Sequence, residues 1–394
     1  MSGSLISPGN LSMDNKIEIS VVLPCLNEEA SIGICVKKIK EVLANNGLNG
    51  EIIVSDNGSL DRSREIAASC GAKVVSEPVK GYGAAYLSGL KEARGRYIVI
   101  GDSDNTYDFC DIPKFLKPLQ EGYDFVMGSR FRGGIKKGSM SWTHRYIGNP
   151  ILSGMCRLFF RTSLSDIHCG MRAFTAEAYR KMQLMALGME FATEMVVSAL
   201  RNNLKIYEVP INYHPRSGTS KLSPLADAWR HIRFMLLYCP AWLYFVPGLA
   251  GFVSGITILL VMSRGPFFFL GRYWDVHFMA FASMLCILSY QVMHLGVYAH
   301  TYAIKQGFLK YDKVTLFFKQ HFNLERGIIL GGGVFLTGFL IIGSIFAEWF
   351  SRHFGELSRV RESILAMTLV VIGIQTVFSS FFISLLFLER KKDS

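Results

Sequence analysis

The sequence predicts two parts of different fold class, an α/β domain built on a mostly parallel sheet and, after it, a bundle of membrane-spanning helices. Up to about residue 213, short β-branched runs alternate with helical patterns, which is typical of a doubly wound sheet. From about residue 241 the chain has four apolar stretches, each near the ~20 residues that span a bilayer. Of the 394 residues, 50% are hydrophobic. The long apolar runs that make this fraction high lie in the second part.

The elements of the first part follow one another with short connections. Pro24 ends the first strand, and Gly71 follows the second helix. The expected elements are strand 17–24, helix 30–43, strand 51–55, helix 61–69, strand 73–76, helix 86–93 and strand 97–100.

Acidic residues follow three of these strands, namely Glu28, Asp56 and the pair Asp102 and Asp104. The carboxyl ends of parallel strands form one edge of the sheet, where ligands bind in open α/β folds. Two carboxylates separated by one small residue suit Mg²⁺ or Mn²⁺, which prefers carboxylates together with substrate phosphates. A solvated loop is the alternative reading of so short a pattern. Gly81, at the start of a helix, is typical of a backbone that approaches an anion.

Charge and cysteine content narrow the function classes. The net charge of +11 fits a protein lying against an anionic membrane face. No zinc-knuckle spacing or RNA-binding signature accompanies that charge, so we expect no nucleic-acid partner. The eight cysteines form no CxxC pair and are expected to be reduced. Residues 1–16, which show no signal-peptide pattern, are expected to form a flexible tail.

Seven motifs stand in order along the first part of the chain. They are VLPCLNEE at 22–29, DNGSLD at 56–61, KGYG at 80–83, GSRF at 128–131, DIHCGMRAF at 166–174, EFATEM at 190–195 and HPRSGTSK at 214–221. Together with Asp102 and Asp104 they resemble family 2 glycosyltransferases with a GT-A fold. The branch they resemble most is that of dolichol-phosphate mannose synthase and polyprenyl-phosphate glycosyltransferases. The resemblance covers about residues 17–240 and implies a cytoplasmic GT-A domain over 17–223.

The resemblance implies a donor site for a UDP- or GDP-sugar. A metal ion held by Asp102 and Asp104 would bridge the donor diphosphate, with Asp104 assigned a catalytic role. The residues implied in binding the nucleotide sugar are Pro24, Leu26, Glu28, Asp56, Gly81, Asp102, Ser103, Arg172 and Glu194. Thr106 stands where the family has a metal-binding Gln, which leaves Asp108 or water as the third ligand. Met171 replaces a family aromatic residue.

The resemblance also implies that the acceptor is a polyprenyl phosphate. A phosphate acceptor needs no strong general base, but it needs cations that hold it in line with the donor. Arg130 and Asp166 are the catalytic candidates here. The implied acceptor-phosphate site consists of Arg130, Arg132, Arg216, Ser220 and Lys221. Residues 216–221 are expected to form a lid that orders on the donor complex.

The second part is expected to lie in and on the membrane. Residues 224–240 have helical apolar spacing with Asp227, Arg230, His231 and Arg233 on a polar face, which predicts an interfacial helix. A core helix is the alternative. The transmembrane domain is expected over 241–388, with spans near 243–262, 277–298, 327–346 and 364–387. A basic connection between the second and third spans and a basic tail at 389–394 place both termini in the cytoplasm.

The sequence therefore predicts a membrane-anchored, metal-dependent enzyme that makes a lipid-phosphate-linked sugar with inversion. One alternative is a family 2 enzyme acting on another lipid or on a growing polysaccharide. Another is a non-catalytic membrane scaffold or transporter that binds nucleotide sugars. The sugar, the nucleotide and the formation of a homo-oligomer are left open.

Overall fold

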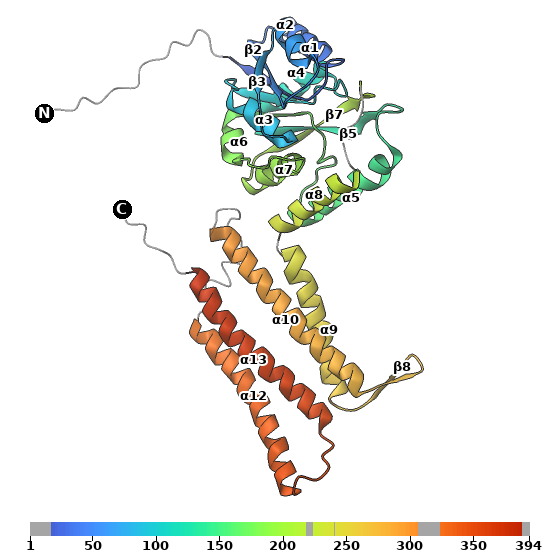
Figure 1. The fold of residues 1–394 in the computed structure, drawn as a ribbon, viewed down its shortest axis with the longest axis vertical. Coiled ribbons are helices and arrows are strands. Elements are labelled where there is room, and N and C mark those ends of the chain that lie inside the picture. Colours follow the sequence, from blue (N-terminus) through green and yellow to red (C-terminus); the bar gives the residue numbers. More distant parts are fainter. Residues whose placement is uncertain (1–16, 218–223, 240, 306–323, 388–394) are drawn as a thin grey trace, which may run out of the picture. The chain divides into compact units, whose positions relative to one another are not determined.

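The computed structural model describes residues 17–217, 224–239, 241–305 and 324–387, and it divides into two compact units at Met235 (Figure 1). The predicted tails 1–16 and 389–394 therefore lie outside the described residues. So do most of the basic connection between the second and third spans, and both Ser220 and Lys221.

The first unit is built on a seven-stranded sheet with the strand order β3-β2-β1-β4-β6-β5-β7. Its strands are β1 (Ile19–Cys25), β2 (Gly50–Asp56), β3 (Lys73–Ser76), β4 (Tyr97–Ile100), β5 (Phe125–Ile135), β6 (Arg172–Thr175) and β7 (Ile206–Tyr213). Only β6 runs against its neighbours β4 and β5, and every other pair is parallel. The predicted mixed, mostly parallel sheet is thus confirmed.

Helices cover both faces of this sheet, because alternate residues of each buried strand point to opposite sides. In β1, Ile19, Val21 and Leu23 belong to one hydrophobic cluster, and Val22 belongs to the other. The helices of the first unit are α1 (Ile32–Asn45), α2 (Ser63–Ser69), α3 (Tyr82–Lys91), α4 (Ile112–Gln120), α5 (Asn149–Phe160), α6 (Ala176–Met182) and α7 (Phe191–Arg201). The division between the units falls inside α8 (Pro224–Tyr238).

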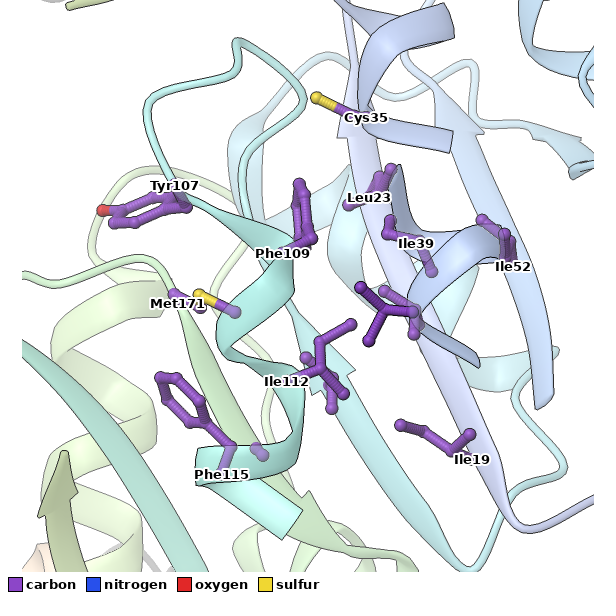
Figure 2. Close-up of a cluster of buried hydrophobic side chains, with 14 of the residues drawn as sticks. Ile19, Leu23, Cys35, Ile39, Ile52, Tyr107, Phe109, Ile112, Phe115 and Met171 are labelled. Atoms are coloured by element: carbon purple, nitrogen blue, oxygen red, sulfur yellow. The ribbon is translucent and has the colours of Figure 1, made fainter. Parts of the chain in front are cut away.

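The first cluster joins α1 and α4 to the sheet, as Figure 2 shows for Leu23, Ile39, Ile112 and Phe115. Each of these four side chains is at most 1% exposed, and burying such a side chain stabilises the fold by about 1.5–3 kcal/mol. The second cluster joins α3, α5 and α7 to the opposite face. Both faces of the sheet are therefore packed against helices, and this packing fixes the positions of the strand ends at which a site can form.

The α8 helix differs from its prediction in one respect. His231, placed on the polar face by its spacing, is only 6% exposed, and Met235 is fully buried in the second cluster. Trp229 is 59% exposed. His231 therefore belongs to the buried face of α8 and not to its polar face. Its Nδ1 lies 2.8 Å from Thr193 Oγ1, and its ring packs edge-on against the His168 ring with 4.4 Å between the ring centres.

The second unit is mostly helical. After a short π-helix (Ala241–Phe245) it contains α9 (Val246–Met262), a hairpin of β8 (Phe267–Phe269) and β9 (Arg272–Trp274), α10 (Val276–Lys305), α12 (Leu324–Ser351) and α13 (Val360–Phe387). Among the described residues, four helices are long and apolar enough to cross a membrane: Trp242–Met262, Val276–Lys305, Leu324–Ser351 and Val360–Leu386.

Small residues let two of these helices approach closely. A Cβ atom added to Gly331 or Gly338 of α12 would lie 2.8 Å from a backbone oxygen of α13. Gly373 of α13 meets the Phe335 backbone of α12 in the same way. Close backbone contact over small residues is how helices pack in lipid, where apolar burial gives no net drive.

Candidate functional site

The Asp102–Asp104 segment lies directly after β4, beside the carboxyl ends of β1 and β2. Two hydrogen bonds tie these ends together. Ser103 Oγ donates to the Pro24 carbonyl at 2.6 Å, and the Asn57 amide donates to the Cys25 carbonyl at 2.8 Å. The acid-bearing turns therefore share one edge of the sheet, as the strand pattern predicts.

Two tyrosines of α3 orient the Asp102 carboxylate. Tyr82 and Tyr86 donate to Asp102 Oδ1 at 2.9 and 3.3 Å. A Cβ atom on Gly170 would lie 2.6 Å from Asp102 Oδ2, so the backbone closes in on the other oxygen. Burial, followed by the nearby Asp104 charge, raises the Asp102 pKa to about 6. The charge of this carboxylate is thus only partly compensated by its neighbours, and a bound cation would stabilise it further.

Asp104 is held by different partners. Its Oδ1 accepts from the Thr106 hydroxyl at 2.5 Å and from the Thr106 amide at 3.1 Å. Thr106, at the position of the family Gln, therefore lies beside the carboxylate pair. Asp108 instead accepts from the Cys110 amide at 3.2 Å and caps a short 3₁₀ turn (Phe109–Asp111). Two carboxylates and a hydroxyl are hard oxygen donors of the kind Mg²⁺ and Mn²⁺ prefer, so these residues fit such an ion.

Arg216, which follows β7, crosses this edge of the sheet. Its guanidinium pairs with Glu28 and lies 3.3 Å from Asp104 Oδ2, while its Nε is buried with no partner among the described residues. The Ser217 amide also donates to the Asp104 carbonyl at 3.2 Å. The segment after β7 is therefore joined to the Asp102–Asp104 segment by a backbone hydrogen bond and by an ion pair.

The turn after β2 is organised by its own polar side chains. Asp56 is fully buried and accepts from the Gly58 and Ser59 amides at 3.1–3.2 Å. Asn57 accepts from the Gly81 amide at 2.8 Å and donates to the Val79 carbonyl at 2.7 Å. This places Gly81, at the start of α3, next to the Asp56 turn. Asn57 was not predicted as a site residue, although it belongs to the DNGSLD motif.

A separate group of charged side chains surrounds Asp166. Arg130 of β5 donates to both Asp166 oxygens through Nε and Nη2, at 2.7 and 2.8 Å, and its amide donates at 3.0 Å. Asp166 is fully buried and Arg130 is 7% exposed. The Arg130 guanidinium also lies 5.2 Å from the centre of the Tyr213 ring.

Glu208 of β7 also belongs to the charged group around Asp166. It accepts from the Ser165 amide at 2.7 Å and pairs with Arg132 at 3.1 Å. The Arg132 side chain is 53% exposed, so it faces solvent while Arg130 does not. No motif pointed to Glu208, because it lies inside β7 among mostly apolar residues.

The side chains of Arg172 and Glu194 form their hydrogen bonds with backbone groups. Arg172, 1% exposed, donates to the carbonyls of Cys169, Ala192 and Ile167 at 2.8, 2.6 and 2.8 Å. Glu194 accepts from the Met185 and Ala186 amides at 3.0 and 2.9 Å, and burial raises its pKa. Both side chains therefore shape the segments around the site. Of the remaining predicted residues, Pro24 lies in β1, and Leu26 and Glu28 lie in the turn after it.

The comparisons with known proteins agree with this architecture. The model of glycosyl transferase family 2 matches residues 20–183, and that of the family 2 C-terminal transmembrane region matches residues 297–387. The chain is 38% identical over 374 residues to the low-salt glycan biosynthesis hexosyltransferase Agl6 of Haloferax volcanii, a match that covers 94% of this chain and 90% of that one. The chain therefore belongs to glycosyltransferase family 2, and it is a membrane protein, as predicted.

Two further similarities are more partial. A dolichyl-phosphate hexose transferase of Haloferax volcanii is 30% identical over 209 residues, covering 53% of this chain and 88% of that one. Glucosyl-3-phosphoglycerate synthase of Mycobacterium tuberculosis, solved with Mn²⁺, uridine diphosphate and glucosyl-3-phosphoglycerate, has a TM-score of 0.46 and 24% identity. That match covers 60% of this chain and 86% of that one.

Proposed function

We propose that this glycosyltransferase moves a hexose from a UDP- or GDP-sugar to a polyprenyl phosphate at the cytoplasmic face of the membrane. The observation that carries the proposal is the Asp102–Asp104 pair, held at the strand ends beside Arg216. The hexose and the lipid phosphate are supported by relatives named as a hexosyltransferase and a dolichyl-phosphate hexose transferase. Candidate membrane spans on the same chain suit a lipid acceptor.

The donor would bind along the edge that carries Glu28, Asp56, Gly81 and the Asp102–Asp104 pair. Asp102 and Asp104 would hold a Mg²⁺ or Mn²⁺ ion, which supplies positive charge to offset the charge of the leaving nucleotide. Tyr82 and Tyr86 fix the Asp102 carboxylate, so its oxygens need no reorientation when the donor arrives. The buried hydrogen bonds of Arg172 and Glu194 hold the neighbouring segments in place.

The acceptor phosphate would be bound by cations on the other side of the donor. Arg132 is exposed enough to reach a ligand, and Arg216 exchanges its contacts with Glu28 and Asp104 for the phosphate. Asp166 holds the Arg130 guanidinium in place beside this site through two hydrogen bonds. Ser220 and Lys221 remain proposed members of the site. Direct attack by one phosphate oxygen on the anomeric carbon, with the nucleotide leaving, inverts the configuration.

The test is sugar transfer by the purified full-length protein in nanodiscs that contain polyprenyl phosphate, with a panel of UDP- and GDP-hexoses. We expect one donor to give product with Mg²⁺ or Mn²⁺, and chelation to abolish it. Asp104→Ala should lower the rate at least about 100-fold, the scale of losing one charge-stabilising group. Glu177→Ala removes an exposed carboxylate that pairs with Lys181 and should leave the rate unchanged. No product with any donor would refute the proposal.

A further inference from the structure

Glu208 is a buried carboxylate within a strand, and none of the sequence motifs assigns it a role. It lies opposite Met127 in the parallel pairing of β7 with β5, and it is 8% exposed. Moving a carboxylate out of water is costly unless hydrogen bonds or a nearby cation compensate its charge. The partners of Glu208 therefore indicate what this buried charge is used for.

The two carboxylate oxygens of Glu208 contact two different segments. Oε1 accepts from the Ser165 amide at 2.7 Å, from the Ser165 hydroxyl at 3.0 Å and from the Asp166 amide at 3.3 Å. Oε2 lies 3.1 Å from Nη2 of Arg132 in β5. One buried carboxylate therefore connects the segment that leads into Asp166 with an arginine of the proposed acceptor site.

An irregularity in β5 brings Arg132 to this carboxylate. The pairing of β5 with β7 is regular up to Ser129 and resumes at Gly134 with a shifted register. Irregularities of this kind change the direction of side chains and are frequent beside active sites. The Arg132 amide donates to Ser129 Oγ at 3.2 Å, and Ser129 Oγ lies 2.7 Å from Ser165 Oγ. Arg132 is therefore held at its backbone by Ser129 and at its guanidinium by Glu208.

The pair of Arg132 and Glu208 is better suited to orientation than to stability. The Arg132 side chain is 53% exposed, and ion pairs with one such exposed partner contribute little to folding. An exposed arginine loses rotamer freedom when it binds a ligand, and this loss weakens binding. An anion that already holds Nη2 reduces the loss and leaves other N–H groups of the guanidinium for the ligand.

We propose that Glu208 is a positioning residue for the acceptor phosphate and that it acts through Arg132. This inference rests on the proposed function, which assigns Arg132 to the polyprenyl phosphate. The same carboxylate fixes the Asp166 amide, and the Asp166 side chain holds Arg130. The positions of both arginines of β5 therefore depend on Glu208.

Glu208→Gln tests the proposal, because a glutamine keeps a carbonyl oxygen for the Ser165 and Asp166 amides but loses the charge that holds Arg132. The measurement is binding of farnesyl phosphate to the full-length protein in nanodiscs, by isothermal titration calorimetry with the signal of empty nanodiscs subtracted. It reports the acceptor site without turnover. We expect Glu208→Gln and Arg132→Ala each to weaken binding several-fold.

The double variant separates positioning from a merely structural role. If Glu208 acts through Arg132, the double variant should bind farnesyl phosphate as weakly as Arg132→Ala alone, because the second substitution then has nothing left to disturb. The matched control is Glu92→Gln, which makes the same change at an exposed carboxylate that pairs with Lys73. Its affinity for farnesyl phosphate should equal that of the parent.

Several results would overturn the proposal. Parent-like binding by either single variant would show that the pair does not serve the acceptor. Tighter binding by Glu208→Gln would make Glu208 a competitor of the acceptor for Arg132. A further loss in the double variant, as large as that of Glu208→Gln alone, would show that Glu208 acts through the fold. A parent that does not bind farnesyl phosphate would refute the acceptor of the proposed function, and the role of Glu208 with it.

Discussion

Removing the Asp166 carboxylate should strongly destabilise the first unit. Asp166→Ala leaves the Arg130 guanidinium, which is 7% exposed, without the anion that now accepts three hydrogen bonds from this arginine. Breaking a buried ion pair from one side costs about 3–5 kcal/mol. For a unit of this size, 1 kcal/mol shifts the melting temperature by about 2–4 °C. The expected fall is therefore about 6–20 °C.

The assay is thermal unfolding of the purified protein in nanodiscs, followed by near-ultraviolet circular dichroism. A double variant, Arg130→Met with Asp166→Leu, removes both charges and should melt above Asp166→Ala, since no uncompensated charge remains buried. Lys181→Ala breaks an exposed pair with Glu177, and its melting temperature should match that of the parent. A melting temperature of Asp166→Ala within about 2 °C of the parent would refute the reasoning.

Three further predictions concern the carboxylate pair, a glycine and a surface charge. Because the Asp102 pKa is raised to about 6, we expect Mn²⁺ affinity to fall about tenfold per pH unit below 6. In the metal-free protein, the contribution of Asp102 to the free energy of unfolding should grow as the pH falls from 6 to 4, because the folded state then binds more protons at this residue. A Mn²⁺ affinity independent of pH would contradict this prediction. Gly83→Ala would place a Cβ atom 2.1 Å from the Ala186 carbonyl and should lower the melting temperature by several degrees. Lys73→Ala breaks an exposed pair with Glu92, and its melting temperature should match the parent.

The sequence was sufficient for the fold class, because alternating strand and helix patterns with short turns between them are local features that define a doubly wound sheet. The place of β6 was not readable, since its pairing with β4 and β5 joins segments far apart in the chain. The acid-bearing turns were predicted to meet, and they do, because parallel strands bring their carboxyl ends to one edge.

Individual side-chain partners were harder to predict than positions. Arg172 stands in a motif, but its three carbonyl partners come from Cys169, Ala192 and Ile167, which no spacing rule connects. An arginine that binds phosphate and one that binds carbonyls look the same in a sequence. His231 shows a similar limit, since its burial depends on Thr193 in another helix.

The most direct test of the account is Mn²⁺ binding by electron paramagnetic resonance, with UDP or GDP present, in the parent and in Asp104→Ala. We expect one nucleotide to increase the amount of protein-bound Mn²⁺ in the parent, and Asp104→Ala to abolish this increase. Equal nucleotide-dependent binding in both proteins would contradict the claim that Asp102 and Asp104 hold the cation of the donor complex.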